Sequence, residues 1–247
     1  MDKYGLIGFP LSHSFSKGYF SEKFAKNQID ATYENFELPD IEGVRDILSD
    51  PGIKGLNVTI PYKEKIIPYL DDLDDAAKEI GAVNVVRMID TPDGRKCIGC
   101  NSDVIGFMDS IRPYLKAYHT KALILGTGGA SKAVAFGLKR EGLDTLLVSR
   151  KPDDNYGVIS YEQLTSDLLK TYTVIVNTTP LGMYPNVENA PAIPYEFLTD
   201  RHLLYDLIYN PAETLFMKKG KDQGAVAVNG LEMLYLQAEA AWLIWNK

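Results

Sequence analysis

The segment from Lys121 to Arg150, KALILGTGGASKAVAFGLKREGLDTLLVSR, constrains the fold of this chain more than any other stretch. An apolar run at residues 122–125 leads into a glycine-rich turn, apolar positions at helical spacing follow, and a second apolar run occupies residues 145–148. A strand, a helix and a second strand in this order form a βαβ unit of the nucleotide-binding type. The sequence therefore predicts an α/β domain with a parallel sheet here.

The glycines of this turn favour a dinucleotide as the ligand. Gly126 and Gly128 match the first two glycines of the dinucleotide fingerprint, and Ser131 occupies the third position. The first glycine permits a tight turn, the second lets the backbone approach a pyrophosphate, and the amides at the helix start supply partial positive charge. A purely structural turn is the alternative, but a strand before it and a helix after it favour dinucleotide binding.

The end of the second strand indicates which dinucleotide is bound. NAD binders place an Asp or Glu about 20 residues past the glycines, whereas an Arg there accommodates the 2'-phosphate of NADP. This chain has Ser149, Arg150 and Lys151 at that point. Two cations and a hydroxyl favour NADP, while Asp153 and Asp154 nearby leave a solvated polar turn as the alternative.

Strand and helix signals alternate elsewhere in the chain as well, which is the pattern of a parallel α/β fold. In the first hundred residues, Asp40 is the expected N-cap of one helix and Gly81 the expected end of another. Trp242 and Trp245 lie on the apolar face of a C-terminal amphipathic helix, where we expect them to pack only. Strands are predicted in KYGLIGFP, ATYENFEL, IKGLNVTIP, YTVIVN, HLLYDLIY and AVAVN, and helices around Phe15–Phe24 and in DIEGVRDILSD, DDAAKEIGAV, TLFMKKGKDQG and LEMLYLQAEAAWLIWNK.

Composition excludes several classes of protein. With 247 residues, 45% hydrophobic residues, a net charge of -7 and a pI near 5.1, the chain resembles a globular protein with no nucleic-acid or acidic-lipid partner. No stretch is apolar enough for a signal peptide or a membrane span, so a cytoplasmic location is expected.

Cysteine and histidine usage predicts no metal site. Cys97 and Cys100 have C-x-x-C spacing, but no second pair completes a zinc site, and both lie in a strand-like alternation, so we interpret them as structural thiols. His13, His119 and His202 are scattered along the sequence.

Polar residues follow three predicted strands directly, in LIGFPLSHS, LNVTIPYK and CIGCNSD. A parallel sheet presents its ligand site at the carboxyl ends of its strands. A single lysine such as Lys63 is usually a solvated surface residue. The convergence of the three motifs favours the interpretation that Lys63 points at a ligand.

These motifs carry a family resemblance over nearly the whole chain. Their order and approximate spacing resemble those of shikimate dehydrogenase. The matching motifs are GFPLSHSFS, NVTIPYK, GAVN, NSDVIGF, GTGGASKA, SRK, VNTTPLGM, YDLIYNP and NGLEMLYLQA.

The resemblance implies an oxidoreductase that reversibly reduces the 3-keto group of 3-dehydroshikimate with NADPH, giving shikimate for chorismate and aromatic amino acid biosynthesis. It implies two α/β domains with an active-site cleft between them. Residues 1–103, completed by the C-terminal helix 231–247, would form the substrate domain, and residues 104–230 the Rossmann-like NADP-binding domain. The expected partner is a small-molecule substrate, and the expected assembly a monomer or homodimer.

The resemblance also implies roles for matched residues. Lys63 and Asp103 resemble the catalytic pair of the family. In that pair, the lysine ammonium hydrogen-bonds the developing alkoxide, and the aspartate carboxylate orients the ammonium. Ser14 and Ser16, with Tyr209, resemble the residues that hold the substrate carboxylate. The residues that resemble the lining of the ring-hydroxyl site are Asn57, Thr59, Asn84 and Gln237. The residues at NADP-contact positions are Gly126, Gly128, Gly129, Ala130, Ser149, Arg150, Lys151, Leu207 and Gly230.

Three positions depart from the family pattern: Val85 and Ser102 each replace a Thr, and Glu232 replaces a Gly. Val85 and Glu232 bear on substrate preference and turnover. Two alternatives remain, namely a quinate or shikimate dehydrogenase that uses NAD, and a non-catalytic dinucleotide sensor. Retention of Lys63 and Asp103 argues against the sensor, and Arg150 argues against NAD.

Overall fold

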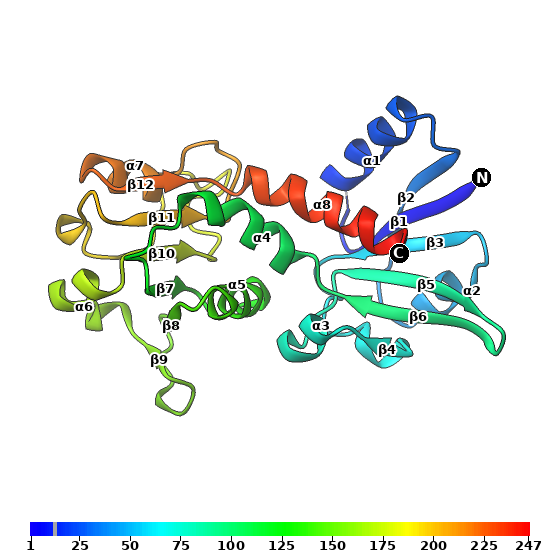
Figure 1. Cartoon of the computed structure of the whole chain (residues 1–247), viewed down its shortest axis with the longest axis horizontal. Helices are drawn as coiled ribbons and strands as arrows, with labels where there is room; N and C mark the ends of the chain where they lie inside the picture. Colours follow the sequence, from blue (N-terminus) through cyan, green and yellow to red (C-terminus); the bar gives the residue numbers. More distant parts are fainter. Residues whose placement is uncertain (12–13) are drawn as a thin grey trace. The chain divides into compact units, whose positions relative to one another are not determined.

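The computed structural model describes residues 1–11 and 14–247, so Ser12 and His13, which belong to the first matching motif, lie outside the described residues. The chain divides into two compact units, one formed by Met1–Ser102 with Ala238–Lys247, and the other by Asp103–Gln237. We call them unit 1 and unit 2. Within the described residues, each unit contains one six-stranded sheet (Figure 1). Among residues 1–11 and 14–247, no helix is long and apolar enough to cross a membrane.

The sheet of unit 1 has the order β2-β1-β3-β5-β6-β4. Strands β1, β2 and β3 are parallel, as the sequence predicts, and β4 pairs with β6 in the same sense. The strands are β1 (Asp2–Gly8), β2 (Ala31–Glu37), β3 (Ile53–Val58), β4 (Asp72–Leu73), β5 (Val85–Thr91) and β6 (Gly94–Cys100).

The parallel pattern predicted for the first hundred residues holds only in part of this sheet, because β5 runs antiparallel to both β3 and β6. Strands β5 and β6 form a hairpin whose turn, Pro92-Asp93, joins the paired residues Thr91 and Gly94. Gly94 has a φ of +117°, and the Thr91 hydroxyl donates a hydrogen bond to the Gly94 carbonyl at 2.6 Å. The sequence TPDG is typical of such a turn, so the local signal was present.

The predicted helix boundaries of unit 1 are partly right. Gly81 ends α3 with a φ of +70°, which confirms that prediction. The predicted cap at Asp40 is wrong, because α2 begins only at Val44. The Asp40 carboxylate accepts a hydrogen bond from the Glu42 N–H at 3.1 Å, and this local turn competes with helix capping. The helices before α4 are α1 (Phe15–Lys26), α2 (Val44–Ser49), α3 (Asp75–Ile80) and the 3₁₀ turn η1 (Ile67–Tyr69).

Two apolar clusters pack on opposite faces of this sheet. One contains Phe20 and Trp245, whose ring centroids lie 5.1 Å apart, and it also includes Cys100. The other contains Val44 of α2 and Cys97. Both cysteines are buried free thiols in β6, and burial raises the pKa of Cys100 to about 12. Their interpretation as structural thiols, and of the C-terminal tryptophans as packing residues, is confirmed.

The sheet of unit 2 is parallel throughout its pairings and has the order β12-β11-β10-β7-β8-β9. The chain enters at β7, builds outward through β8 and β9, and then returns to the other side of β7 with β10. This reversal is the topological switch point where doubly wound sheets bind ligands. The strands are β7 (Lys121–Leu125), β8 (Asp144–Val148), β9 (Val158–Ile159), β10 (Val174–Asn177), β11 (Leu203–Asp206) and β12 (Val226–Val228).

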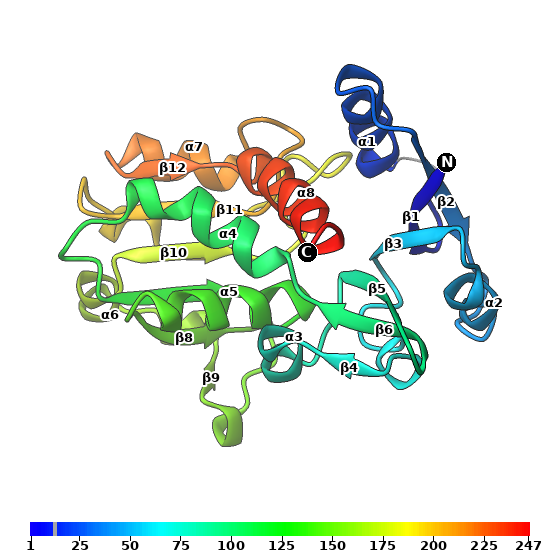
Figure 2. The same ribbon diagram turned by 45° about the vertical axis from the view of Figure 1, so that its right-hand side comes forward.

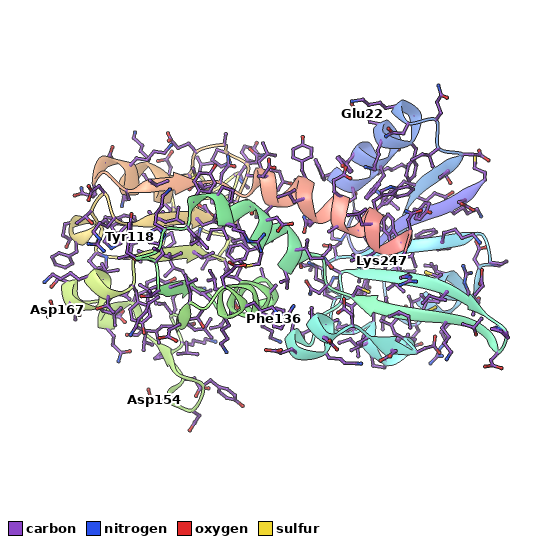
Figure 3. The ribbon with its side chains drawn as sticks, viewed as in Figure 1. Glu22, Tyr118, Phe136, Asp154, Asp167 and Lys247 are labelled. Atoms are coloured by element: carbon purple, nitrogen blue, oxygen red, sulfur yellow. The ribbon has the colours of Figure 1, made fainter. Side chains whose placement is uncertain are left out.

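Helix α5 (Gly129–Arg140) is the predicted crossover helix, and Phe136 is one of its buried residues (Figure 3). Helix α4 (Asp103–Ile111), which is not among the predicted helices, lies beside α5 (Figure 2). Gly137 permits this approach, because a Cβ there would lie 2.5 Å from the Met108 sulfur. The remaining helices are α6 (Ser166–Thr171), α7 (Leu215–Asp222) and α8 (Leu231–Trp245), with 3₁₀ turns η2 (Arg112–Tyr114), η3 (Asp154–Tyr156), η4 (Tyr161–Gln163) and η5 (Tyr195–Phe197).

Candidate active site

The carboxyl ends of three strands meet at one edge of the sheet of unit 1. The register aligns Leu6 of β1, Asn57 of β3, Val85 of β5 and Cys100 of β6 in one row. Because β5 is antiparallel, its first residues lie at the same edge as the ends of β1, β3 and β6. Asn84, directly before β5, bonds through its backbone to the ends of both β3 and β6. The polar residues that follow these strands therefore lie close together at this edge of the sheet.

A chain of hydrogen bonds runs across this edge. The Tyr33 hydroxyl is hydrogen-bonded to Ser16 and donates to Asn57 Oδ1 at 2.8 Å. The Asn57 amide donates to the main-chain carbonyl of Asn84 at 3.4 Å. The Asn84 amide donates to Ser102 Oγ at 3.0 Å, and its Oδ1 accepts from the Ser102 N–H at 2.7 Å. Ser102 keeps the hydroxyl of the threonine that it replaces, and this hydroxyl accepts the hydrogen bond from Asn84.

The loop after β3 carries Thr59 and Lys63 along the same edge. The Thr59 N–H donates to the Ile7 carbonyl at 2.9 Å, and the Val83 N–H donates to the Lys63 carbonyl at 2.7 Å. The neighbouring Tyr62 side chain is buried. Lys63 itself is half-buried. These two bonds hold the backbone around Lys63 against the end of β1 and against the segment that precedes β5.

Helix α1 begins at this edge, directly after Ser14. The Ser14 hydroxyl accepts a hydrogen bond from the Lys17 N–H at 3.4 Å, so Ser14 caps the helix. Ser16 lies in its first turn. A helix N-terminus with two hydroxyls suits an anionic group such as a carboxylate.

The other sequence-predicted residues of this group belong to unit 2. Asp103 is the first residue of α4 and is buried, at 8% exposed. Gln237 is half-buried on α8, where a Cβ on Gly106 would lie 2.8 Å from its main-chain nitrogen. Tyr209 is 43% exposed. Glu232 is exposed in the first turn of α8, where a negative charge suits the helix dipole.

The glycine turn of unit 2 has a geometry that fits a pyrophosphate. Gly126 has a φ of +108°, and a Cβ on it would lie 2.8 Å from the Thr178 hydroxyl. Gly128 and Gly129 have open space at their Cβ positions, so their backbone is accessible at the start of α5. Ser131, in place of the third glycine, is buried and donates to the Gly128 carbonyl at 2.6 Å. The residues of this turn therefore fit the pyrophosphate of a dinucleotide.

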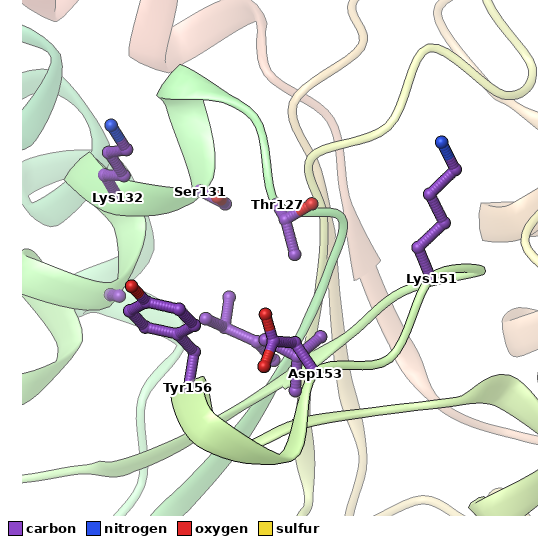
Figure 4. Close-up of a pocket in the computed structure, with 9 residues that line it drawn as sticks. Thr127, Ser131, Lys132, Lys151, Asp153 and Tyr156 are labelled. Atoms are coloured by element: carbon purple, nitrogen blue, oxygen red, sulfur yellow. The ribbon is translucent and has the colours of Figure 1, made fainter.

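Two cavities adjoin this turn. The first, of about 250 Å³, includes Ser149 and Arg150; the second, of about 390 Å³, includes Lys151. Asp153 and Asp154 both belong to the loop between β8 and β9 (Figure 3), and Asp153 lines the second cavity (Figure 4). The first cavity is lined by Gly126, Thr127, Gly128, Ser149, Arg150, Tyr161, Thr178, Thr179, Pro180 and Leu181, and the second by Thr127, Ser131, Lys132, Ala135, Leu147, Lys151, Asp153, Tyr156 and Val158.

The loops after β11 and β12 complete this edge of unit 2. The Leu207 N–H donates to the Asn177 carbonyl at 3.1 Å, and the Gly230 N–H donates to the Ile208 carbonyl at 3.1 Å. A Cβ on Gly230 would lie 2.1 Å from the Leu207 carbonyl oxygen, so the close approach requires glycine. The structure therefore brings these two predicted cofactor positions together.

Asp206, which is not among the predicted site residues, holds these loops. Its carboxylate accepts from the Thr214 hydroxyl at 2.6 Å, the Asn177 amide at 3.0 Å and the Ile208 N–H at 3.1 Å. Burial raises the pKa of Asp206 to about 6, although these hydrogen bonds act to lower it. Nothing in the motif YDLIYNP indicates that its acidic residue, Asp206, is buried.

We expect Asp206 to make the free energy of unfolding fall as the pH rises. Its pKa is about 6 in the folded chain and 3.8 ordinarily, so the folded state holds an extra proton between these values. This contribution is full below the lower pKa and is lost as the pH rises through the upper one, by about 3 kcal/mol for roughly two pKa units. Denaturant unfolding of the wild type and Asp206→Asn at about pH 4 and pH 7 measures it. Identical pH dependence in the two chains would contradict it.

Among residues 1–11 and 14–247, no three His, Cys, Asp or Glu side chains form a group that could hold a metal ion. His13 lies outside this set.

Comparisons with known proteins agree on one family. Residues 6–86 match the family model described as the shikimate dehydrogenase substrate binding domain. The NADP(+) shikimate dehydrogenase of Methanosphaera stadtmanae is 36% identical, over 98% of this chain and 90% of the relative.

Solved structures give the same result. A shikimate dehydrogenase crystallised in complex with NADP+ has 33% identity and a TM-score of 0.87, over 99% of this chain and 90% of that one. The Thermus thermophilus enzyme, in complex with NADP(H) and shikimate, has 28% identity and a TM-score of 0.84, over 99% and 93% of the two chains.

Proposed function

This chain belongs to the shikimate dehydrogenase family, and we propose that Lys63 and Asp103 are the catalytic residues of its reaction. The reaction is the reversible NADP-dependent reduction of 3-dehydroshikimate to shikimate, a step of chorismate and aromatic amino acid biosynthesis. The observation that carries the residue assignment is the single edge of the sheet in unit 1 where Asn57, Asn84 and Ser102 are hydrogen-bonded in series.

When bound, NADP(H) supplies or accepts the hydride. Lys63 handles the proton at the 3-oxygen: its ammonium hydrogen-bonds the oxygen as negative charge develops and gives up a proton to it. Asp103 supplies the negative charge that orients this ammonium and accepts a hydrogen bond from a neighbouring substrate hydroxyl. The fixed backbone around Lys63 supports this role, because a preorganised donor needs little rearrangement during the reaction.

The substrate is anionic and carries several hydroxyls, and the proposed ligands match both features. Ser14 and Ser16, at the N-terminus of α1, bind the carboxylate, and Tyr209 donates a further hydrogen bond. The side chains assigned to the ring hydroxyls are Asn57, Thr59, Asn84 and Gln237.

The coenzyme contacts are assigned to unit 2. The amides of Gly126, Gly128, Gly129 and Ala130 bind the pyrophosphate, and the backbone of Leu207 and Gly230 contacts the coenzyme farther along the edge. Ser149, Arg150 and Lys151 bind the 2'-phosphate. Support comes from the open backbone of the turn and from the two adjacent cavities.

Oxidation of shikimate and of quinate, each with NADP and with NAD, tests the proposal by the absorbance of the reduced coenzyme. We expect turnover with shikimate and NADP. Preferred use of NAD or quinate would favour the alternative dehydrogenase, and binding of shikimate without turnover would favour the sensor.

We expect Asp103→Asn to lower kcat about tenfold, because the amide keeps the shape of the carboxylate but lacks the charge that orients Lys63. The KM for shikimate also rises, since a hydroxyl partner is altered. Steady-state rates of Asp103→Asn, Lys63→Ala and the double variant measure the pairing. Losses that simply added in free energy would show that the two residues act independently.

A further inference from the structure

Tyr33 of β2 lies between Ser16 and Asn57 in the hydrogen-bond chain of unit 1, and its ring is held in place. It is 4% exposed. The ring stacks on Phe20, with centroids 4.8 Å apart and planes 10° from parallel, and its centroid lies 6.4 Å from that of Trp245. Packing on this scale leaves the phenol one position, so the hydroxyl oxygen is fixed.

The hydroxyl of Tyr33 connects two groups that come from different elements. Its single proton goes to Asn57 Oδ1, because a carboxamide oxygen can only accept. The phenol has no second proton to donate, so in its bond with Ser16 the Tyr33 oxygen accepts from the Ser16 hydroxyl. One phenol oxygen thus orients a side chain of α1 and a side chain of β3.

The donated proton also decides which way the Asn57 carboxamide faces. With Oδ1 held by Tyr33, the NH₂ group lies on the opposite side, where it donates to the Asn84 carbonyl at 3.4 Å. An amide without the Tyr33 bond could turn over and exchange its donor and acceptor positions. In a fraction of the protein molecules, a ligand hydroxyl at Asn57 would then face the carboxamide oxygen where it needs the NH₂ group, or the reverse.

We propose that Tyr33 is a positioning residue for substrate recognition, which acts by holding the Ser16 hydroxyl and the Asn57 carboxamide in the orientations that bind shikimate. The inference rests on the proposed function, because it takes Ser16 and Asn57 as substrate ligands. It adds a residue that touches no substrate itself, and it links the carboxylate end of the site to the ring-hydroxyl end.

Tyr4 offers a matched control. It pairs directly with Tyr33 across β1 and β2 and is equally buried, at 4% exposed. It belongs to the same apolar cluster, and its ring centroid lies 4.9 Å from that of Trp245. Tyr4→Phe therefore removes a hydroxyl from the same core without removing the bonds to Ser16 and Asn57.

The test is the affinity of Tyr33→Phe for shikimate, measured by titration calorimetry without coenzyme, together with the KM values for shikimate and NADP. We expect the shikimate dissociation constant and KM to rise about tenfold, the loss of roughly one to two hydrogen bonds. The KM for NADP stays unchanged, which also shows that the chain is folded. Tyr4→Phe leaves all three values near those of the wild type.

A double-mutant cycle with Asn57→Ala identifies the route of the effect. If Tyr33 acts partly through Asn57, Tyr33→Phe weakens shikimate binding less in the Asn57→Ala background than in the wild type. Equal effects in both backgrounds, or a Tyr33→Phe variant that behaves like Tyr4→Phe, would overturn the inference alone. A wild type that failed to oxidise shikimate with NADP would overturn the proposed function, and the inference with it.

Discussion

Replacement of Lys63 by alanine is expected to lower kcat by about 10²- to 10⁴-fold, the range for loss of a general acid that also stabilises a developing alkoxide. The methyl group can neither donate to the 3-oxygen nor transfer a proton. The KM for NADP is expected to stay the same, because the coenzyme contacts are assigned to unit 2. Initial rates with saturating shikimate and NADP, measured by the absorbance of NADPH, give the result.

Lys65→Ala is the control for this variant. Lys65 stands two residues farther along the same loop and is exposed, so its removal changes the net charge equally. We expect its kcat to stay within about twofold of the wild type, as for surface substitutions in general. A Lys63→Ala chain that kept most of its kcat would show that another group handles the proton.

Replacement of Arg150 by alanine is expected to lower kcat/KM for NADP by about 10- to 150-fold, since hydrogen bonds to charged groups contribute about 1.5 to 3 kcal/mol. The same variant should use NAD almost as well as the parent does. NAD and NADP share the pyrophosphate that the glycine turn binds, so only groups near the adenine ribose can discriminate between them. A guanidinium can bind the 2'-phosphate through two hydrogen bonds.

Two further variants separate the geometry of Arg150 from its charge. Arg150→Lys keeps the charge but loses the planar fork, so it should fall between the parent and Arg150→Ala. Lys139→Ala, at an exposed position in the last turn of α5, removes a charge of the same sign elsewhere in unit 2 and should change neither coenzyme constant. Equal proportional losses for NAD and NADP in Arg150→Ala, or a parent that prefers NAD, would refute the assignment.

Local sequence patterns predicted most of unit 2, because each of its strands is a short apolar run bounded by glycine or polar residues. Helix α4 was missed although Val104, Phe107, Met108 and Ile111 repeat at helical spacing and are all buried. In unit 1, no strand is predicted over β5 (Val85–Thr91), and periodicity alone would not show that this strand is antiparallel. Direction follows from the turn, and the TPDG turn was the available signal.

The sequence points to the residues of the candidate site one by one, but not to the hydrogen bonds that connect them. Lys63, Asn57 and Asn84 stand in linear motifs directly beside strand ends, so a sequence can point to them. Tyr33 and Asp206 have roles that arise from partners distant in the sequence: Tyr33 bonds to Asn57, and Asp206 bonds to Asn177. A tyrosine in an alternating strand has no local property that distinguishes a hydrogen-bond centre from an ordinary core residue.

The discontinuous composition of unit 1 has a consequence for biosynthesis of the chain. Its core needs Trp245, which packs so closely on β3 that a Cβ on Gly55 would lie 2.2 Å from the indole. During translation, residues 1–102 leave the ribosome long before residues 238–247, whereas unit 2 is one uninterrupted segment. The core of unit 1 therefore cannot close before α8 is available, and until then Phe20, Phe24 and Tyr33 lack the packing of Trp245.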